Sequence, residues 1–98
     1  MYIIRFSKRA DKDKKLLKGA GLVLKAKTLL DMIAENPFQN PPPYEGLVGN
    51  LNGYYSRRIN IQHRLVYQVY NEPAVIDGTA YEGTIKVIRM WSHYDAVR

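Results

Sequence analysis

The segment NLNGYYSRRINIQHRLVYQVY, residues 50–70, decides the fold of this chain. It holds two runs rich in aromatic and β-branched residues, 54–59 and 63–70, and residues 60–62 separate them. Runs of this kind joined by a short polar turn are typical of a β-hairpin. Asn52-Gly53, just before the first run, is a further turn signal. The sequence therefore predicts two antiparallel strands here.

Cationic side chains are dense in this hairpin, and the strand periodicity sorts them between two faces. Successive side chains point to opposite faces of a strand, so the neighbours Arg57 and Arg58 face opposite sides. At most one of the two can point into a given site, and we expect the other to lie at the surface. Arg64 alternates with the predicted core face of the second strand, whose residues are Leu65, Tyr67 and Val69. We therefore expect a sheet with one buried face and one solvated face that carries arginines.

Before the hairpin, the sequence predicts one strand and two helices. Residues 2–6 are β-branched and aromatic, which is typical of a strand, and Ser7 is placed to cap a helix over 8–18. Apolar residues at helical spacing predict a second helix over 22–35, which Pro37 terminates. Glycines between these segments favour a helical hairpin that covers the sheet.

After the helices, the sequence predicts a stiff loop and further strands. The segment NPFQNPPP, residues 36–43, is held extended by its prolines. Residues 74–76 fit a short strand, 77–83 a polar excursion, and 84–91 the last strand. The predicted fold class is α+β, with two N-terminal helices packed on one face of an antiparallel sheet in the order β-α-α-β-β-β.

The composition is that of one small folded domain. The chain has 98 residues, of which 46% are hydrophobic, so we expect a single domain over 1–98. It has no cysteine and no apolar run near the roughly 18 residues of a membrane helix. The charged start does not resemble a signal peptide, so we expect a cytoplasmic protein without membrane contact. A net charge of +6 favours nucleic acid or an acidic protein as partner.

One carboxylate, the arginines and a histidine–tyrosine pair are the residues able to carry chemistry. Two histidines without cysteine argue against a metal site, and the glycine-rich segment 46–53 lacks the lysine of a phosphate-binding loop. Cleavage of RNA by its own ribose 2′-hydroxyl needs a base, an acid and cations, and requires no metal or cofactor. Glu45, the arginines and His93-Tyr94 match that need.

Each of these side chains also has an ordinary structural interpretation. Glu45 fits a solvated loop, Arg64 a surface ion pair, and His93 a capping or packing role. Tyr55 could stack on bases, although aromatic residues in strands more often pack against their neighbours. Trp91 fits the core better than a ligand contact.

Taken with its flanks, the hairpin resembles the YoeB/Txe toxins of the RelE superfamily, the toxin components of bacterial toxin–antitoxin modules. The resemblance is carried by the motif NLxGxxSRRIxxxHRLVY, the upstream segment 43–47 and the terminal His93-Tyr94. It is specific over 36–70, looser over the last strand, and limited to pattern and helix order before that. The resemblance implies a RelE-like fold.

The same resemblance implies a ribosome-dependent mRNA endonuclease that cuts in the ribosomal A site. By this analogy Glu45 is the general base, His93 the general acid and Arg64 the group that stabilises the scissile phosphate. Tyr94 would orient the substrate. Residues implied to bind RNA or phosphate are Arg58, Tyr55 and His63. The implied partners are mRNA on the ribosome, an acidic antitoxin of the YefM/Phd type and promoter DNA, with a homodimer left open.

Three departures from the family pattern are visible. Val48 stands where the family usually carries a lysine, the chain over 70–85 is longer than usual, and residues 95–98 follow the His-Tyr pair. We expect activity to survive them. Two other interpretations stay open: a non-catalytic relative that poisons DNA gyrase, and a basic RNA-binding domain. Relatives of the first kind tend to lack the glutamate and the His-Tyr pair, both of which are present here.

Overall fold

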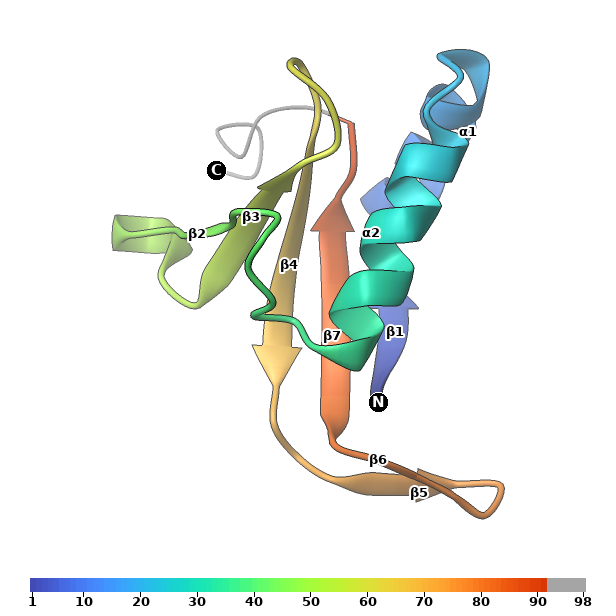
Figure 1. Ribbon diagram of the computed structural model, residues 1–98, viewed down its shortest axis with the longest axis vertical. Helices are drawn as coiled ribbons and strands as arrows, with labels where there is room; N and C mark the ends of the chain where they lie inside the picture. Colours follow the sequence, from blue (N-terminus) through green and yellow to red (C-terminus); the bar gives the residue numbers. More distant parts are fainter. Residues whose placement is uncertain (92–98) are drawn as a thin grey trace.

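The computed structural model describes residues 1–91, with Leu51 described by its backbone alone. Two helices and a five-stranded sheet form the body of the protein, and a two-stranded sheet projects from one end (Figure 1). The elements in chain order are β1 (Tyr2–Phe6), α1 (Lys8–Gly19), α2 (Val23–Glu35), β2 (Glu45–Gly46), the 3-10 helix η1 (Gly49–Leu51), β3 (Tyr54–Arg58), β4 (Arg64–Tyr70), β5 (Ala74–Ile76), β6 (Thr79–Tyr81) and β7 (Gly83–Arg89).

The main sheet has the strand order β1-β7-β4-β3-β2. The predicted hairpin is confirmed, because β3 and β4 pair antiparallel with Arg58 opposite Arg64. The β2–β3 and β4–β7 pairs are antiparallel as well. By contrast, β1 runs parallel to β7, which differs from the wholly antiparallel sheet expected from the sequence. Most of the chain lies between these two strands, so no local turn sets their relative direction.

Both helices cover one face of the main sheet, as predicted (Figure 1). The core lies between these layers, and the alternation of β4 decides which side chains enter it. Leu65 and Tyr67 are fully buried there, packed with residues such as Leu17 and Ile33 from the helices. Val66, between them, faces the other way. It forms a smaller apolar cluster with Leu47, Tyr54 and Ile88.

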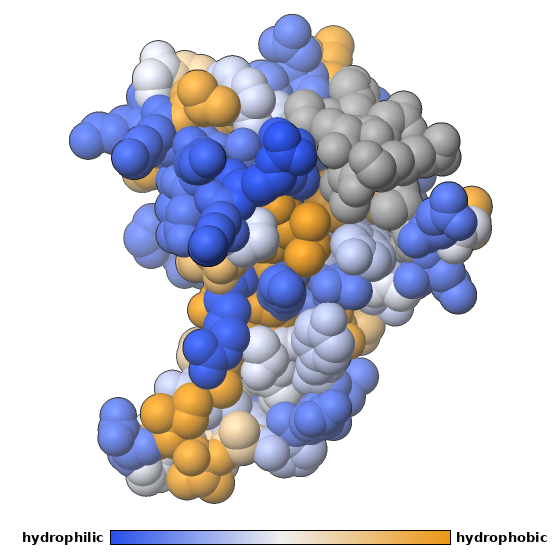
Figure 2. Space-filling model, turned by 180° about the vertical axis from the view of Figure 1, so that it is seen from behind, coloured by the Kyte–Doolittle hydropathy of each residue, from blue (hydrophilic) through white to orange (hydrophobic). Residues whose placement is uncertain are grey.

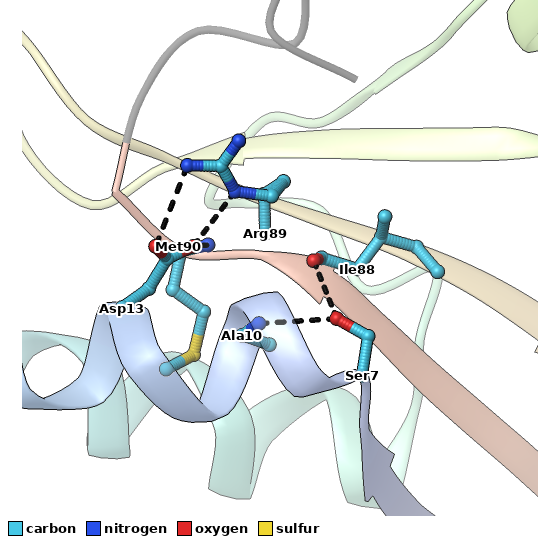
Figure 3. A network of polar contacts seen from close by, with 6 residues as sticks. All are labelled: Ser7, Ala10, Asp13, Ile88, Arg89 and Met90. Atoms are coloured by element: carbon cyan, nitrogen blue, oxygen red, sulfur yellow. Dashed lines mark hydrogen bonds and ion pairs between the residues drawn. The ribbon is translucent and has the colours of Figure 1, made fainter. Parts of the chain in front are cut away.

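Polar contacts tie α1 to the end of β7 (Figure 3). Ser7 caps α1 as predicted, since its Oγ accepts a hydrogen bond from the Ala10 amide at 3.0 Å. The buried Asp13 carboxylate accepts hydrogen bonds from Arg89 Nε and from the Met90 amide, each at 2.9 Å. These contacts fix the point at which the chain leaves the sheet toward its C-terminus.

The expected strand at 74–76 is present as β5, but it does not join the main sheet. It pairs with β6, which lies within the segment expected to be a polar excursion. Asp77 and Gly78 form the turn between them with positive φ. The resulting β5–β6 arm projects from the body, and hydrophobic side chains are exposed along it (Figures 1 and 2). Val75 there is 71% exposed.

Within residues 1–91, neither helix has the length and apolar character needed to cross a membrane.

Candidate active site

Glu45 and Arg64 form an ion pair on the solvated face of the sheet. Glu45 lies on the short edge strand β2, opposite Ser56 of β3. Arg64 Nη2 donates to Glu45 Oε1 at 2.7 Å, and Arg64 Nε donates to the Ser56 hydroxyl. The Arg64 side chain is 15% exposed and that of Glu45 is 53% exposed. The guanidinium is therefore held in place by the sheet, while the carboxylate stays accessible from solvent.

A pocket of about 450 Å³ opens beside this ion pair. Its lining residues are Pro43, Tyr44, Glu45, Arg58 and Arg64. Two guanidinium groups and one carboxylate give the pocket a net positive charge. Guanidinium groups are planar, permanently charged and matched to phosphate oxygens, so the pocket is suited to an anionic group such as a phosphate.

The hairpin register explains why Arg58 and Arg64 share this pocket. The two residues are direct partners across β3 and β4, so their side chains leave the same face of the sheet. The sequence assigned Arg58 to the site because it lies across the short turn from Arg64. The structure brings both together with Glu45, while their chemical roles stay predictions.

The structure does not bring Tyr55 to this pocket. Strand alternation puts it on the helix-covered face, where it packs against the core. Its ring is 5.1 Å from that of Phe38, 6.1 Å from that of Tyr44 and 5.8 Å from that of Tyr67, measured between centroids. Tyr55 therefore lies in an aromatic cluster apart from Arg58 and Arg64, and its role in RNA binding stays a prediction.

His63 lies just before β4, and it too is absent from the pocket wall. Its ring stacks on Trp91 with centroids 3.9 Å apart and planes inclined by 18°. Among residues 1–91, its Nδ1 atom is buried without a hydrogen-bond partner. Trp91 also packs against the core, as expected from the sequence. The stack attaches the hairpin turn to the end of β7.

Two predicted site residues, His93 and Tyr94, lie outside the described residues. Val48 lies within them; its side chain is 82% exposed and, being apolar, supplies no cation at this position.

Sequence reasoning missed Arg57, which is fully buried. It donates four hydrogen bonds, to the carbonyls of Pro37, Gln39 and Pro42 and to the hydroxyl of Tyr67. Burial raises the pKa of Tyr67 above its ordinary value, and the hydrogen bond and charge of Arg57 partly oppose this rise. Strand alternation places the two adjacent arginines on opposite faces, and the one outside the site is predicted to lie at the surface. That prediction is wrong, because Arg57 is buried against the proline-rich loop.

The fold and this pocket together define the class of protein. Two helices on a mostly antiparallel sheet, with the strand order described above, form a RelE-like α+β fold. A YoeB/ParE toxin from Agrobacterium tumefaciens superposes with a TM-score of 0.78 at 26% identity, covering 94% of this chain and 99% of that one.

Sequence comparison gives the family. The profile of the YoeB-like toxins of bacterial type II toxin-antitoxin systems matches residues 6–94, and the chain belongs to this family. The Toxin YoeB of Synechocystis sp. is 47% identical over 64 residues, which are 65% of this chain and 67% of that protein. The YoeB of a YoeB-YefM complex from Staphylococcus aureus is 36% identical with a TM-score of 0.69, covering 96% and 99% of the two chains.

Proposed function

We propose that this protein is a ribosome-dependent mRNA endonuclease that cuts mRNA in the ribosomal A site. The observation that carries the proposal is the Glu45–Arg64 ion pair, with its 2.7 Å contact, in a pocket that also holds Arg58. An accessible carboxylate beside two guanidinium groups supports acid–base attack on a phosphodiester. Membership of the YoeB-like toxins supports the choice of mRNA on the ribosome as substrate.

In the proposed reaction, Glu45 takes the proton of the ribose 2′-hydroxyl, whose oxygen attacks the adjacent phosphorus. Arg64 and Arg58 stabilise the negative charge that develops on the phosphorane oxygens. The 5′ oxygen leaves with a proton from His93, and Tyr94 orients the substrate. The products are a 2′,3′-cyclic phosphate and a free 5′-hydroxyl, so this mechanism needs no metal ion or cofactor.

We propose that an acidic antitoxin binds and neutralises the protein when it is not cleaving mRNA. We place both proteins in the bacterial cytoplasm. The net charge of +6 supports such a partner, and the S. aureus relative was solved in complex with YefM. We propose that the toxin–antitoxin complex also binds its own promoter DNA. His63, which stacks on Trp91 beyond the end of β7, is proposed to bind RNA outside the pocket.

The test is primer extension on mRNA in a purified translation system. We expect cuts in the A-site codon with the wild type, and a loss of at least about 100-fold in rate for Glu45→Ala and for His93→Ala. Glu72→Ala is the matched control, because Glu72 is an exposed carboxylate far along the chain from the pocket. A folded wild type that makes no cuts would contradict the proposal and favour the non-catalytic, gyrase-poisoning class.

A further inference from the structure

Arg57 is a fully buried cation whose hydrogen-bond acceptors in the described part of the chain are all neutral. It is 0% exposed, and no ion pair between residues 1–91 involves it. The free-energy cost of burying an unpaired charge is high unless strong hydrogen bonds replace the lost water. Packing alone does not explain a buried arginine beside the pocket residue Arg58, because an apolar side chain would fill the same space at lower cost.

The hydrogen bonds of Arg57 converge on the proline-rich loop. Nη1 donates to the Pro42 carbonyl at 2.6 Å, and Nη2 donates to the carbonyls of Gln39 at 2.7 Å and Pro37 at 3.1 Å. Nε donates to the hydroxyl of Tyr67 at 3.0 Å, and that hydroxyl donates to the Pro37 carbonyl at 2.7 Å. One guanidinium thus holds three carbonyls along the loop.

The sequence of the loop explains why its carbonyls need a side chain as hydrogen-bond donor. Proline has no amide hydrogen, so the segment NPFQNPPP has few backbone donors with which to fix its shape. The fork of five N–H donors on arginine can hold several carbonyls at once, whereas the ammonium group of lysine acts more nearly as a point charge. The Tyr44 ring adds a further contact, with its centroid 4.8 Å from the guanidinium carbon.

The loop ends at the candidate catalytic carboxylate. Pro42 is bound by Arg57, Pro43 and Tyr44 line the pocket, and Glu45 follows as the first residue of β2. The position of the Glu45 backbone is therefore set from both sides. The β2–β3 ladder fixes one side, and the carbonyl contacts of Arg57 fix the other.

We infer that Arg57 is a positioning residue, which sets the loop so that the Glu45 carboxylate stands against Arg64 in the pocket. This inference rests on the proposed function for its effect on the rate of cleavage, but not for its effect on geometry. The two adjacent arginines then both serve the pocket, from opposite faces of β3. Arg58 faces the substrate pocket, and Arg57 holds the loop that supplies the base.

The variant to test is Arg57→Lys, which keeps the charge and loses the fork. We expect the single-turnover rate on programmed ribosomes to fall about 10- to 100-fold, with the half-saturating ribosome concentration changed less than about twofold. Combining it with Glu45→Gln should cause little further loss beyond Glu45→Gln alone, because both act through one carboxylate. Ile33→Val, in the core of α2, is the control for simple destabilisation.

A second readout does not depend on cleavage. In the isolated protein, Arg57→Lys should shift the carboxyl ¹³C resonance of Glu45, whereas Ile33→Val should not. If Arg57→Lys fails to fold, Tyr67→Phe serves instead, since it removes two hydrogen bonds of the same network, one of them to Arg57, and should give a smaller change in the same direction.

The two readouts separate the outcomes. An unchanged Glu45 resonance, or a loss of rate no larger than that of Ile33→Val, overturns the inference. A shifted resonance in a protein whose wild type does not cleave mRNA leaves the positioning role intact and removes the proposed function.

Discussion

Arg58 and Arg64 lie directly opposite each other on β3 and β4. Like charges at opposed positions of an antiparallel ladder repel each other. Glu45 offsets the charge of Arg64 through the 2.7 Å contact, but no ion pair between residues 1–91 involves Arg58. The hairpin therefore keeps an electrostatic cost at this position. Such a local conflict is expected where the sequence is selected for binding an anion and not for stability.

Removing the unpaired charge should stabilise the free protein. For Arg58→Ala we expect the free energy of unfolding to rise by about 0.5 kcal/mol at low ionic strength, because the repulsion with Arg64 is lost. Added salt should shrink this gain, since the groups are near solvent. Urea unfolding at low and high salt measures both effects. A loss of stability at every salt concentration would show that Arg58 is held by favourable contacts instead.

The same substitution should weaken binding to RNA. If Arg58 contacts a phosphate, the slope of log affinity against log salt concentration should become smaller in magnitude by about 0.7 for single-stranded RNA. Arg5→Ala is a matched control, because Arg5 is an exposed arginine on β1 at the other edge of the sheet. Equal changes in slope for the two variants would mean that Arg58 contributes only to overall charge.

The contact between Asp13 and Arg89 should be the most sensitive polar pair among residues 1–91. Their side chains are 5% and 12% exposed, and Asp13 also accepts the Met90 amide. Asp13→Ala leaves that guanidinium and that amide without their acceptor, so we expect a loss of about 3 kcal/mol in the free energy of unfolding. Asp11→Ala, which breaks the exposed Asp11–Lys14 pair, should cost no more than about 0.5 kcal/mol. Chemical denaturation of both variants compares them directly.

Most of the fold follows from local sequence patterns. The two helices, the Ser7 cap and the β3–β4 hairpin depend on periodicity and turn chemistry that short segments carry. The parallel pairing of β1 with β7 and the separate β5–β6 sheet could not be obtained in this way. Both depend on contacts between distant residues, and the length of a segment does not tell whether it joins the main sheet or folds on itself.

In the candidate site, too, the features set by local patterns could be predicted, and those set by contacts between distant residues could not. The short turn of the hairpin put Arg58 across from Arg64, so their meeting in the pocket could be predicted from the hairpin alone. Strand alternation places Tyr55 on the opposite face, where it packs against neighbouring rings, as aromatic residues in strands more often do. The role of Arg57 was hidden because three of its four hydrogen-bond acceptors are backbone carbonyls, which leave no pattern of side chains to detect.

The β5–β6 arm should be dispensable for the fold and for cleavage. It leaves the end of β4 far from Arg64, and its links to the body include the Glu82 amide bonded to the Met1 carbonyl at 3.0 Å (Figure 1). Replacing residues 72–82 by Asn-Gly would join β4 and β7 by a two-residue turn. We expect a loss of about 1 kcal/mol in stability and unchanged cleavage. A folded variant that no longer cleaves mRNA would assign the arm to substrate binding.

The buried hydroxyl of Tyr67 should make the protein less stable in alkaline solution. Burial raises the pKa of Tyr67 above its ordinary value of 10.0, and Arg57 opposes this rise only in part. In the unfolded chain the phenol loses its proton near pH 10, whereas in the folded protein it keeps the proton to higher pH. The folded state therefore binds more protons above that pH, and stability must fall as the pH rises. Below about pH 10 this contribution is fully present.

Urea unfolding between about pH 8 and pH 11 tests this linkage with Tyr67→Phe. At the lower pH the variant should be less stable than the wild type by about 1 kcal/mol, because Arg57 Nε loses its acceptor. As the pH rises past the unfolded-state pKa, the difference should shrink, since the variant has no phenol to titrate at this site. Tyr70→Phe is the control, because it removes a phenol from a residue that is 43% exposed and keeps Tyr67. The stability of this variant should fall with rising pH in parallel with that of the wild type. Parallel curves for Tyr67→Phe and the wild type would mean that Tyr67 titrates alike in the folded and unfolded states.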